Sequence, residues 1–346
     1  MMNAVTSSPS LPRDVFDRPM RDLRVSVTDR CNFRCPFCMP ADRQYTFMPR
    51  PEILTFEEIT RVVRLFVDLG VRKVRLTGGE PLLRAQIETL VAQLRAIDGL
   101  EDLALTTNAY LLPKHAAALK EAGLDRVTVS LHSLEPETFA RMNGLGYPLS
   151  KVLDGIEAAV QAGLAPVKLN TVVICGTNEH EIVDIARYAR EIGAVVRYIE
   201  YMDVGTVNSW DAANVFSARQ IVDAIDAVFP VEPVAKDHRG EVADRYRYVD
   251  GGGEIGVITS VTQPFCGDCT RVRLSAEGRI YTCLFAAMGH DLKKAIREGK
   301  SDEEIQDGIR QIWGSRTDRY SEERTTALKA GEFVAADKVE MFRIGG

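Results

Sequence analysis

The sequence predicts an α/β fold, in which an incomplete barrel of six βα repeats is followed by a smaller α+β extension. The first observation is the alternation of short β-rich runs with amphipathic helical stretches from about residue 22 to residue 228. The second is that this alternation stops near residue 228, where short strand-like pieces and a glycine loop take over. Repeated βα units predict a parallel sheet with helices outside, and right-handed crossovers can curl that sheet into a barrel.

We therefore divide the chain into three parts. Residues 1–20 are rich in Pro, Ser and Arg and are predicted to form an N-terminal arm with little core. Residues 21–228 form the partial barrel, and residues 229–346 form the C-terminal region. Strands are expected at 22–28, 72–77, 102–108, 126–132, 166–174 and 195–202. Helices are expected between them, for example at 56–70 and 84–97, and near 290–299 and 302–313 in the C-terminal region.

The two faces of the predicted strands differ in character. Every second residue is apolar on one face, as in Leu23, Val25 and Val27, and this face should pack on the helices. The opposite face is polar and basic, and it carries Arg24, Ser26, Thr28, Lys73, Arg75, Thr77, Thr106, Asn108, Thr128, Ser130, Lys168 and Asn170. An ordinary barrel fills its interior with branched apolar side chains. Because unpaired charges are costly to bury, we expect a wet cavity that holds an anionic ligand. The alternative is that these cations pair with carboxylates at strand ends.

Composition narrows the class of protein. The residues are 45% hydrophobic, as in a globular protein, and no run is long and apolar enough for a membrane helix. The first residues contain no stretch typical of a secretory signal, so we expect a cytoplasmic protein. In that reducing compartment, clustered cysteines bind metal more often than they form disulfides. The net charge of −6 argues against nucleic acid as the partner.

Three cysteines follow the first strand directly, at the end where α/β sheets place their sites. Cys31, Cys35 and Cys38 have the spacing C-x3-C-x2-C. No histidine lies beside them, so a zinc ion would need a distant fourth ligand. Three thiolates can instead hold an iron–sulfur cube whose fourth iron stays open to a ligand.

A second set, Cys266, Cys269 and Cys283, has the spacing C-x2-C-x13-C. A zinc ribbon or knuckle is the alternative here, but His238 and His290 stand in no usual ligand spacing. A second iron–sulfur cluster with an open iron agrees better with this pattern. Cys175, alone at a strand end, is expected to be a structural cysteine.

C-x3-C-x2-C after the first strand of a βα repeat resembles the radical S-adenosylmethionine (SAM) superfamily. A second mark of that superfamily is TGGEP at 77–81, in which Gly78 and Gly79 allow close backbone approach. The cysteine motif, RLTGGEPLLR, TTN, RYIEYMDVG, the second cysteine cluster and the terminal Gly-Gly together resemble the GTP 3′,8-cyclase family, also called the molybdenum cofactor biosynthesis protein A family. The likeness covers residues 11–346.

This resemblance implies an incomplete TIM-type barrel of the radical SAM type and a carbon-carbon lyase. The reaction converts GTP to (8S)-3′,8-cyclo-7,8-dihydroguanosine 5′-triphosphate via a 5′-deoxyadenosyl radical, the first step of molybdenum cofactor (molybdopterin) biosynthesis. The implied cofactors are SAM and two [4Fe-4S] clusters, the second on the C-terminal extension. The implied partners are a reductant such as flavodoxin or ferredoxin and, downstream, cyclic pyranopterin monophosphate synthase. The state is a monomer or a homodimer, and neither nucleic acid nor membrane is a partner.

The resemblance also assigns roles by position. Cys31, Cys35 and Cys38 match the ligands of the first cluster, and Cys266, Cys269 and Cys283 match those of the second. Phe37, Gly79, Ser130 and Met202 match the SAM contacts. Arg24, Arg75, Thr106, Lys168, Arg197, Arg271 and Arg273 match the GTP contacts. Arg271, Arg273, Gly345 and Gly346 match positions needed for catalysis, the last two in a tail that reaches the active site.

Two positions depart from the family pattern: His132 stands where Asp is common, and Ala109 where Gly is common. Two other functions remain open from the residues alone. One is a radical SAM enzyme that modifies another substrate, such as a peptide. The other is a zinc-stabilised binding or scaffold protein.

Overall fold

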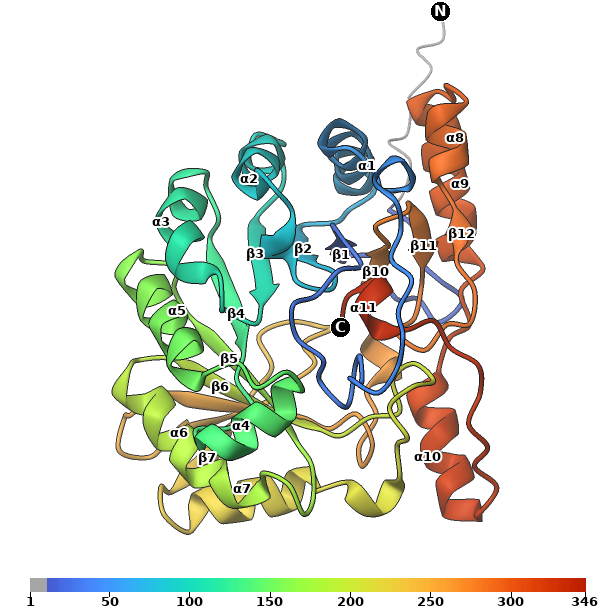
Figure 1. Ribbon diagram of the computed structural model, residues 1–346. Coiled ribbons are helices and arrows are strands. Elements are labelled where there is room, and N and C mark those ends of the chain that lie inside the picture. The colour runs from blue at the N-terminus through green and yellow to red at the C-terminus, as the bar shows by residue number, and fades with distance from the viewer. Residues whose placement is uncertain (1–10) are drawn as a thin grey trace, which may run out of the picture.

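A computed structural model describes residues 11–346 (Figure 1). Six parallel strands run in sequence order, as predicted. They are β1 (Asp22–Ser26), β2 (Lys73–Thr77), β3 (Asp102–Thr107), β4 (Arg126–Ser130), β5 (Lys168–Val173) and β6 (Val195–Glu200). The helices among and after them are α1 (Phe56–Asp68), α2 (Ile87–Arg95), α3 (Leu112–Glu121), α4 (Pro136–Asn143), α5 (Leu149–Gln161), α6 (Ile182–Glu191) and α7 (Ala218–Asp226). Five of the six strands end one or two residues earlier than predicted, so Thr28, His132 and Met202 lie in the loops beyond them.

The C-terminal region extends this sheet at both edges. Its elements are β7 (Val231–Val234), β8 (Asp244–Tyr248), β9 (Glu254–Ile258), β10 (Arg271–Leu274), β11 (Arg279–Tyr281), β12 (His290–Asp291), α8 (Lys293–Arg297), α9 (Asp302–Gly314), α10 (Tyr320–Ala330) and α11 (Met341–Ile344). Strand β10 pairs parallel with β1, and β9 pairs parallel with β6. The full order is β12-β11-β10-β1-β2-β3-β4-β5-β6-β9-β8-β7. The ends of this order are not paired with each other, so the barrel is incomplete, as predicted.

Strand register gathers the polar side chains into rows. Arg24 lies opposite Arg75 on one side and Arg273 on the other. Thr128 lies opposite Thr106 and Lys168 in the same way. Residues in register point to the same face of a sheet. A cation from the C-terminal region thus joins the row formed by the first two strands.

The apolar face of the sheet packs against the helices, which follow one another around the outside of the arc (Figure 1). Leu23, Val25, Val74 and Leu76 are fully buried there. Helix α1 begins at a capping box, in which the Thr55 side chain and the Glu58 side chain each bond the other's backbone. The apolar core therefore lies between the sheet and the helices, and the inner face of the sheet carries polar side chains.

Helix α11 contacts β1, and the C-terminus lies near the middle of the arc (Figure 1). The boundary predicted near residue 228 falls between α7 and β7, and it stays a prediction, because strands from both sides of it share one sheet. The prediction of an arm with little core is wrong for its last residues, since Met20 lies in the main core and Arg18 is fully buried. Residues 1–10 of that arm lie outside the described residues. In the described part of the chain, no helix has the length and apolar character to span a membrane.

Candidate active site

Two cavities lie inside the curved sheet. One, of about 260 Å³, is lined by all six predicted cluster cysteines and by the loops after the parallel strands. The other, of about 300 Å³, is lined by residues at the starts of those strands, including Lys73 and Lys168. Four arginines line both cavities: Arg24, Arg75, Arg197 and Arg271. The interior therefore runs from a cysteine-rich end to a basic end, with these arginines between them.

Six cations of this interior form no ion pair with any carboxylate of residues 11–346: Arg24, Arg75, Lys168, Arg197, Arg271 and Arg273. Two neighbours behave differently. Lys73 lies 3.5 Å from a carboxylate oxygen of Asp102, and Arg126 also pairs with Asp102. The alternative of carboxylate pairing thus holds for Lys73 and Arg126 and fails for the six. Among those six, Arg75 donates hydrogen bonds only to neutral partners, the hydroxyls of Thr106 and Thr128.

Burial and repulsion from neighbouring cations lower the pKa values of five of these six side chains. For Arg271 the effect of burial is outweighed by the negative charge of the Cys269 thiolate, so its pKa is raised. Burial, then the charges of Arg273 and Arg75, holds the pKa of Arg24 well below its ordinary value. Burial is also the first cause for four others, and lowers the pKa to about 10 for Arg75, about 9 for Arg197 and Arg273, and about 7 for Lys168. A site that crowds desolvated positive charges together gains most from a ligand with several negative charges.

The first cysteine set lies on a single loop, the one that follows β1. The N–H groups of Cys38 and Met39 both donate to the carbonyl oxygen of Cys35, at 3.0 and 2.8 Å. The Arg34 side chain donates to the Cys31 carbonyl at 2.8 Å. Burial, and next the Glu80 carboxyl, raises the pKa of the Cys31 thiol to about 12, and burial followed by the neighbouring thiols raises that of Cys35. These thiols become strong ligands only when a metal displaces their protons.

The glycines of TGGEP bring the loop after β2 against the loop after β1. A Cβ on Gly78 would lie 2.3 Å from the Thr28 carbonyl oxygen, and one on Gly79 would lie 2.2 Å from that of Arg30. No side chain fits at either position. The buried Glu80 carboxyl accepts hydrogen bonds from Thr107 Oγ1 at 2.7 Å and from the N–H of residue 108 at 2.8 Å. It ties the loops after β2 and β3 together beside the first cysteines.

The four predicted SAM contacts line the cysteine-rich cavity: Phe37, Gly79, Ser130 and Met202. Phe37 packs edge-on against His132, with ring centroids 4.9 Å apart. Burial lowers the pKa of His132 to about 4, so its ring is neutral at pH 7, and its Nδ1 accepts a hydrogen bond from the Val172 N–H at 3.2 Å. His132, which departs from the family pattern, therefore packs as a neutral ring against Phe37 in the wall of this cavity.

The second cysteine set is assembled from separate segments. Cys266 and Cys269 flank a short turn before β10, and Cys283 follows β11. Arg271 Nη2 donates to Cys269 Sγ at 3.2 Å. Burial alone would raise the pKa of the Cys269 thiol, but the Arg271 and Arg316 guanidiniums lower it to about 6. By contrast, burial raises the pKa of Cys283 to about 12.

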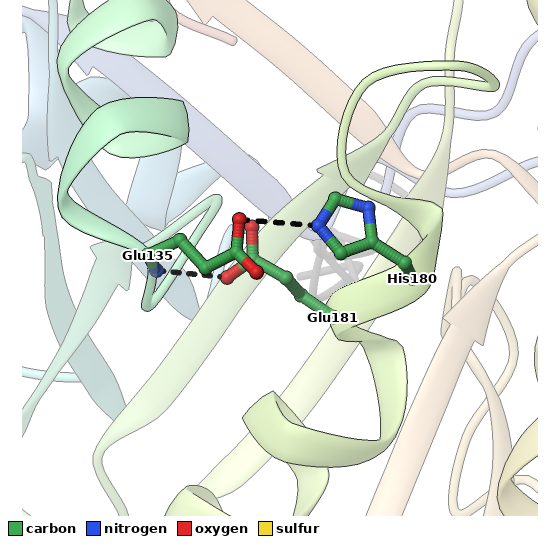
Figure 2. A group of neighbouring side chains, drawn as sticks. All are labelled: Glu135, His180 and Glu181. Atoms are coloured by element: carbon green, nitrogen blue, oxygen red, sulfur yellow. Dashed lines mark hydrogen bonds and ion pairs between the residues drawn. The ribbon is translucent and has the colours of Figure 1, made fainter.

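The spacing of the sulfurs argues against one zinc ion at either set. Thiolates on one zinc at about 2.3 Å must lie within roughly 4.6 Å of each other. Among residues 11–346, only Glu135, His180 and Glu181 bring three ligand atoms of the metal-binding types within 4.8 Å of one another (Figure 2). That trio has another explanation: Glu181 is buried and accepts hydrogen bonds from Ser133 Oγ and from two backbone N–H groups, while His180 pairs with Glu135 at the surface. It locks α4 to the turn before α6.

The C-terminal tail enters the cysteine-rich cavity. Arg273 donates to the carbonyl oxygens of Ile344, at 3.3 Å, and Gly345. Gly345 has φ +72°, and a Cβ there would lie 2.1 Å from Thr77 Cγ2, so only glycine fits. Gly346 lines the cavity itself. The structure thus brings the four predicted catalytic positions together.

Thr106 also lines the cysteine-rich cavity, and Lys168 lines the basic one. Sequence reasoning missed Arg316 and Asp318, which line the cavity beside the second cysteines. Their stretch, WGSRTDR at 313–319, carries no motif, and only the fold brings it there. Cys175, predicted to be a structural cysteine, is instead exposed.

The chain was then compared with known proteins. A family model described as the radical SAM superfamily matches residues 25–189, and one described as Molybdenum Cofactor Synthesis C matches residues 194–322. The GTP 3′,8-cyclase of Acidothermus cellulolyticus is 52% identical over 90% of this chain and 88% of its own length. Those of Xanthomonas axonopodis pv. citri and Staphylococcus haemolyticus are 48% and 43% identical, each over 96% of this chain and 98% of their own length.

Among solved structures, Streptococcus suis SuiB bound to S-adenosylmethionine matches with a TM-score of 0.58. The match covers 84% of this chain and 68% of that one at 15% identity, and it shows the fold alone. Identity at the level of the three cyclases, over nearly the whole of both chains, shows the family. The chain belongs to the GTP 3′,8-cyclase family of the radical SAM superfamily.

Proposed function

We propose that this chain converts GTP to (8S)-3′,8-cyclo-7,8-dihydroguanosine 5′-triphosphate, as a radical SAM lyase in the first step of molybdenum cofactor biosynthesis. The observation that carries this proposal is a group of six cations, one buried and five half-buried, without carboxylate partners among residues 11–346. They lie in an interior whose other end is lined by both sets of three cysteines. A nucleoside triphosphate supplies several negative charges to such a group and a base and sugar to the space beside the cysteines. A neutral peptide would leave these cations desolvated and unpaired.

Membership of the radical SAM superfamily brings one [4Fe-4S] cluster and SAM. Cys31, Cys35 and Cys38 fit the first cluster, since all three thiols line one cavity and thiolates are the ligands that iron–sulfur clusters prefer. The open iron of such a cluster is where the amino and carboxylate groups of SAM bind. Phe37, Gly79, Ser130 and Met202 are the proposed SAM contacts, and the two close backbone approaches at TGGEP leave room for the ligand on this wall.

GTP is proposed to lie with its phosphates toward the basic cavity and its guanine toward the second cysteine set. Lys168 lines only the basic cavity, whereas Thr106 and Arg273 line only the cysteine-rich one. Arg24, Arg75, Arg197 and Arg271 line both, so they can contact phosphates and sugar along the length of the nucleotide. Guanidinium groups suit this work, because their fixed fork of donors matches phosphate oxygens.

A second [4Fe-4S] cluster at Cys266, Cys269 and Cys283 is part of the proposal. The Cys269 thiol, with its pKa lowered to about 6, is already largely thiolate at pH 7. Arg271 Nε is buried without a hydrogen-bond partner among the described residues, although its Nη2 reaches Cys269 Sγ. A buried donor beside a thiolate fits a site that binds anionic sulfur.

The chemistry that the bound cluster and SAM supply is one-electron cleavage of SAM to a 5′-deoxyadenosyl radical. The chain's own residues orient the nucleotide and exclude water. The six cations fix the phosphates, so that the ribose lies at a set distance from the first cysteine set. Arg273 holds the Gly345 backbone, and the tail then closes one side of the cavity. The electron donor and the synthase that consumes the product stay proposals from family likeness.

Anaerobic incubation of the reconstituted protein with GTP, SAM and dithionite tests the function. We expect 5′-deoxyadenosine and a cyclised guanine nucleotide in equal amounts, and no cyclised product from ATP. Formation of 5′-deoxyadenosine without any change in GTP would contradict the proposal. Equal turnover of ATP and GTP would contradict the assignment of guanine to the second cysteine set.

A further inference from the structure

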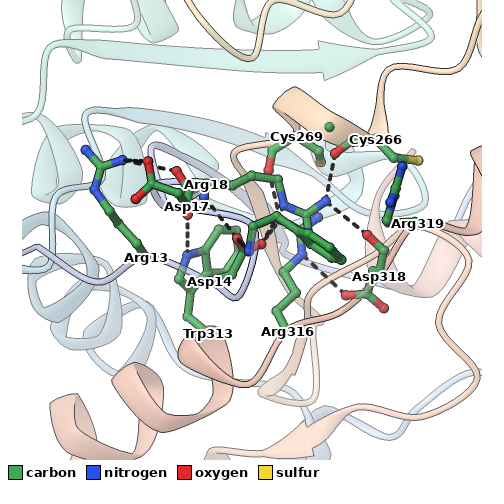
Figure 3. A network of polar contacts seen from close by, with 12 residues as sticks. Arg13, Asp14, Asp17, Arg18, Cys266, Cys269, Trp313, Arg316, Asp318 and Arg319 are labelled. Atoms are coloured by element: carbon green, nitrogen blue, oxygen red, sulfur yellow. Dashed lines mark hydrogen bonds and ion pairs between the residues drawn. The ribbon is translucent and has the colours of Figure 1, made fainter.

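The arm at residues 11–20 closes over the second cysteine set (Figure 3). Arg18, which is fully buried, donates from Nη1 to the carbonyl oxygen of Cys266 at 2.7 Å and to that of Asp318 at 3.0 Å. Its Nε donates to Asp14 Oδ2 at 2.5 Å. The two carbonyl partners are 248 and 300 residues away in the sequence. One guanidinium thus joins the arm, the cysteine turn and the segment before α10.

Arg316 makes the matching contact at the neighbouring cysteine. Its Nη1 donates to the carbonyl oxygen of Cys269 at 2.8 Å and lies 3.4 Å from Asp14 Oδ2. Its guanidinium lies 4.6 Å from the ring centre of Trp313, whose Nε1 donates to the Arg18 carbonyl at 3.0 Å. Both cysteines of the C-x2-C pair are therefore held at their carbonyl oxygens by buried guanidiniums, which share one carboxylate.

One donor in this network of Arg18, Arg316 and Asp14 has no hydrogen-bond partner in the described part of the chain. Arg18 Nη2 is buried and has no hydrogen-bond partner within residues 11–346. A buried donor without an acceptor is unfavourable, because it has lost its hydrogen bonds to water without replacement. If Arg18 served only to pack the arm, an apolar side chain would stabilise the fold as well or better, because well-packed apolar groups often match or exceed buried ion pairs in their contribution to stability. Asp14 and Asp318 offset the charges of the two arginines. What points to the second cysteine set is that both guanidiniums donate to its backbone carbonyl oxygens, while Arg18 keeps one buried donor without a partner among the described residues on the same guanidinium.

We propose that Arg18 and Arg316, joined by Asp14, are positioning residues for the second cysteine set. They fix the backbone of Cys266 and Cys269 and place positive charge beside the cluster bound there. The inference rests on the second cluster of the proposed function. It gives the arm a role in the active site, and it makes retention of the second cluster depend on residues at the opposite end of the chain.

The test uses Arg18→Met in the full-length, anaerobically reconstituted protein, with iron release to a chelator followed by visible absorbance. We expect about half of the iron, that of one of two like clusters, to be released at least several-fold faster than in the unchanged protein. Before the iron is released, the second cluster should give a lower midpoint potential than in the unchanged protein, because a positive charge has been removed. SAM cleavage without GTP, which needs only the first set, should stay within about twofold of normal.

Arg13→Met is the matched control, because Arg13 lies on the same arm, is exposed and pairs only within the arm. It should leave iron release unchanged. Arg18→Lys should restore retention only in part, because one ammonium cannot reproduce the fork of donors.

Unchanged iron release and potential in Arg18→Met would overturn the inference. Parallel loss of both clusters and of SAM cleavage would overturn it too, since it would indicate general unfolding. If the unchanged protein itself binds the iron of only one cluster, the second cluster of the proposed function is what fails.

Discussion

The two cysteine sets resemble each other in sequence but are built in different ways. The first set lies on one loop, where backbone hydrogen bonds to Cys35 and a neighbouring arginine hold the chain. The second set draws on β10, β11, the segment before α10 and the arm, with Arg271 and Arg316 beside Cys269. The first loop also contacts the loops after β2 and β3 and the end of α4, whereas the second set depends on segments from both ends of the chain.

The pKa values of the thiols also differ between the two sets. Burial raises the pKa of Cys31 to about 12, but two arginines lower that of Cys269 to about 6. The first set therefore gains its negative charge when metal binds, and the second is partly prepared for it by the fold. This difference predicts separate behaviour when each set is damaged.

The largest expected effect comes from Cys283→Ser. Because Cys283 belongs to the second set, we expect nucleotide cyclisation to fall to background while SAM binding and its cleavage to 5′-deoxyadenosine persist. Cys38→Ser, in the first set, should abolish both. Product formation and SAM cleavage, measured in the same reactions, check the division of roles. Equal loss of SAM cleavage in the two variants would mean that the sets do not have separate roles.

Much of the first set could be predicted from sequence because its determinants are local. The strand, the cysteine spacing and the glycines at 78 and 79 stand close together in the chain or at neighbouring strand ends. The polar inner face was likewise predictable, because alternation along a strand fixes which residues share a face.

The supports of the second set could not be predicted in this way. Arg18 and Asp14 contact groups about three hundred positions away, and no spacing rule connects them. The parallel pairing of β10 with β1, which brings Arg273 beside Arg24, is equally a long-range event. Local patterns carry no information on such contacts, so the arm was predicted to have little core.

A second prediction concerns Arg273, at the edge of the second set. Loss of one charge-assisted contact costs about 1.5–3 kcal/mol, so Arg273→Met should weaken GTP binding by roughly 10- to 150-fold. SAM affinity should stay unchanged, because SAM is assigned to the first set. Equilibrium dialysis of both ligands measures this, with the exposed Arg219→Met as control. An equal loss of SAM affinity would remove the distinction between the two sides.

The third prediction uses pH to probe the basic cavity, which Lys168 lines and which lies at the other end of the interior from both cysteine sets. Burial, then repulsion from Arg197, lowers the pKa of Lys168 to about 7, so this amine is largely neutral above that pH. Phosphate groups favour the ammonium form, so GTP binding above pH 7 should take up a proton. Affinity should then fall as pH rises from 7.5 to 9, by up to about tenfold per unit.

Calorimetry in two buffers with different ionisation enthalpies counts the proton taken up. Lys168→Met should bind GTP more weakly and lose the pH dependence. The assignment fails if the native protein shows no proton uptake, or if the variant keeps the same slope.

The smallest expected effect lies beside the first set, at Ala109. Its φ of +63° lies in the left-handed region, which costs a non-glycine residue about 1–2 kcal/mol. Ala109→Gly would relieve that cost, but it would also remove a buried methyl, about 0.8 kcal/mol, and add flexibility to the unfolded chain, about 0.4–1 kcal/mol. These terms nearly cancel, so we expect the free energy of unfolding to change by less than about 1 kcal/mol.

Gly155→Ala is the matched variant with the opposite expectation, because Gly155 on α5 packs against Ala109. A Cβ on Gly155 would lie 2.2 Å from the Ala109 carbonyl oxygen, so α5 would have to move, and the melting temperature should fall clearly. Thermal unfolding of both variants by circular dichroism makes the comparison. A shift of several degrees in Ala109→Gly would show that the departure at position 109 is compensated elsewhere. The absence of a shift would show that the backbone and packing terms at position 109 balance, as expected.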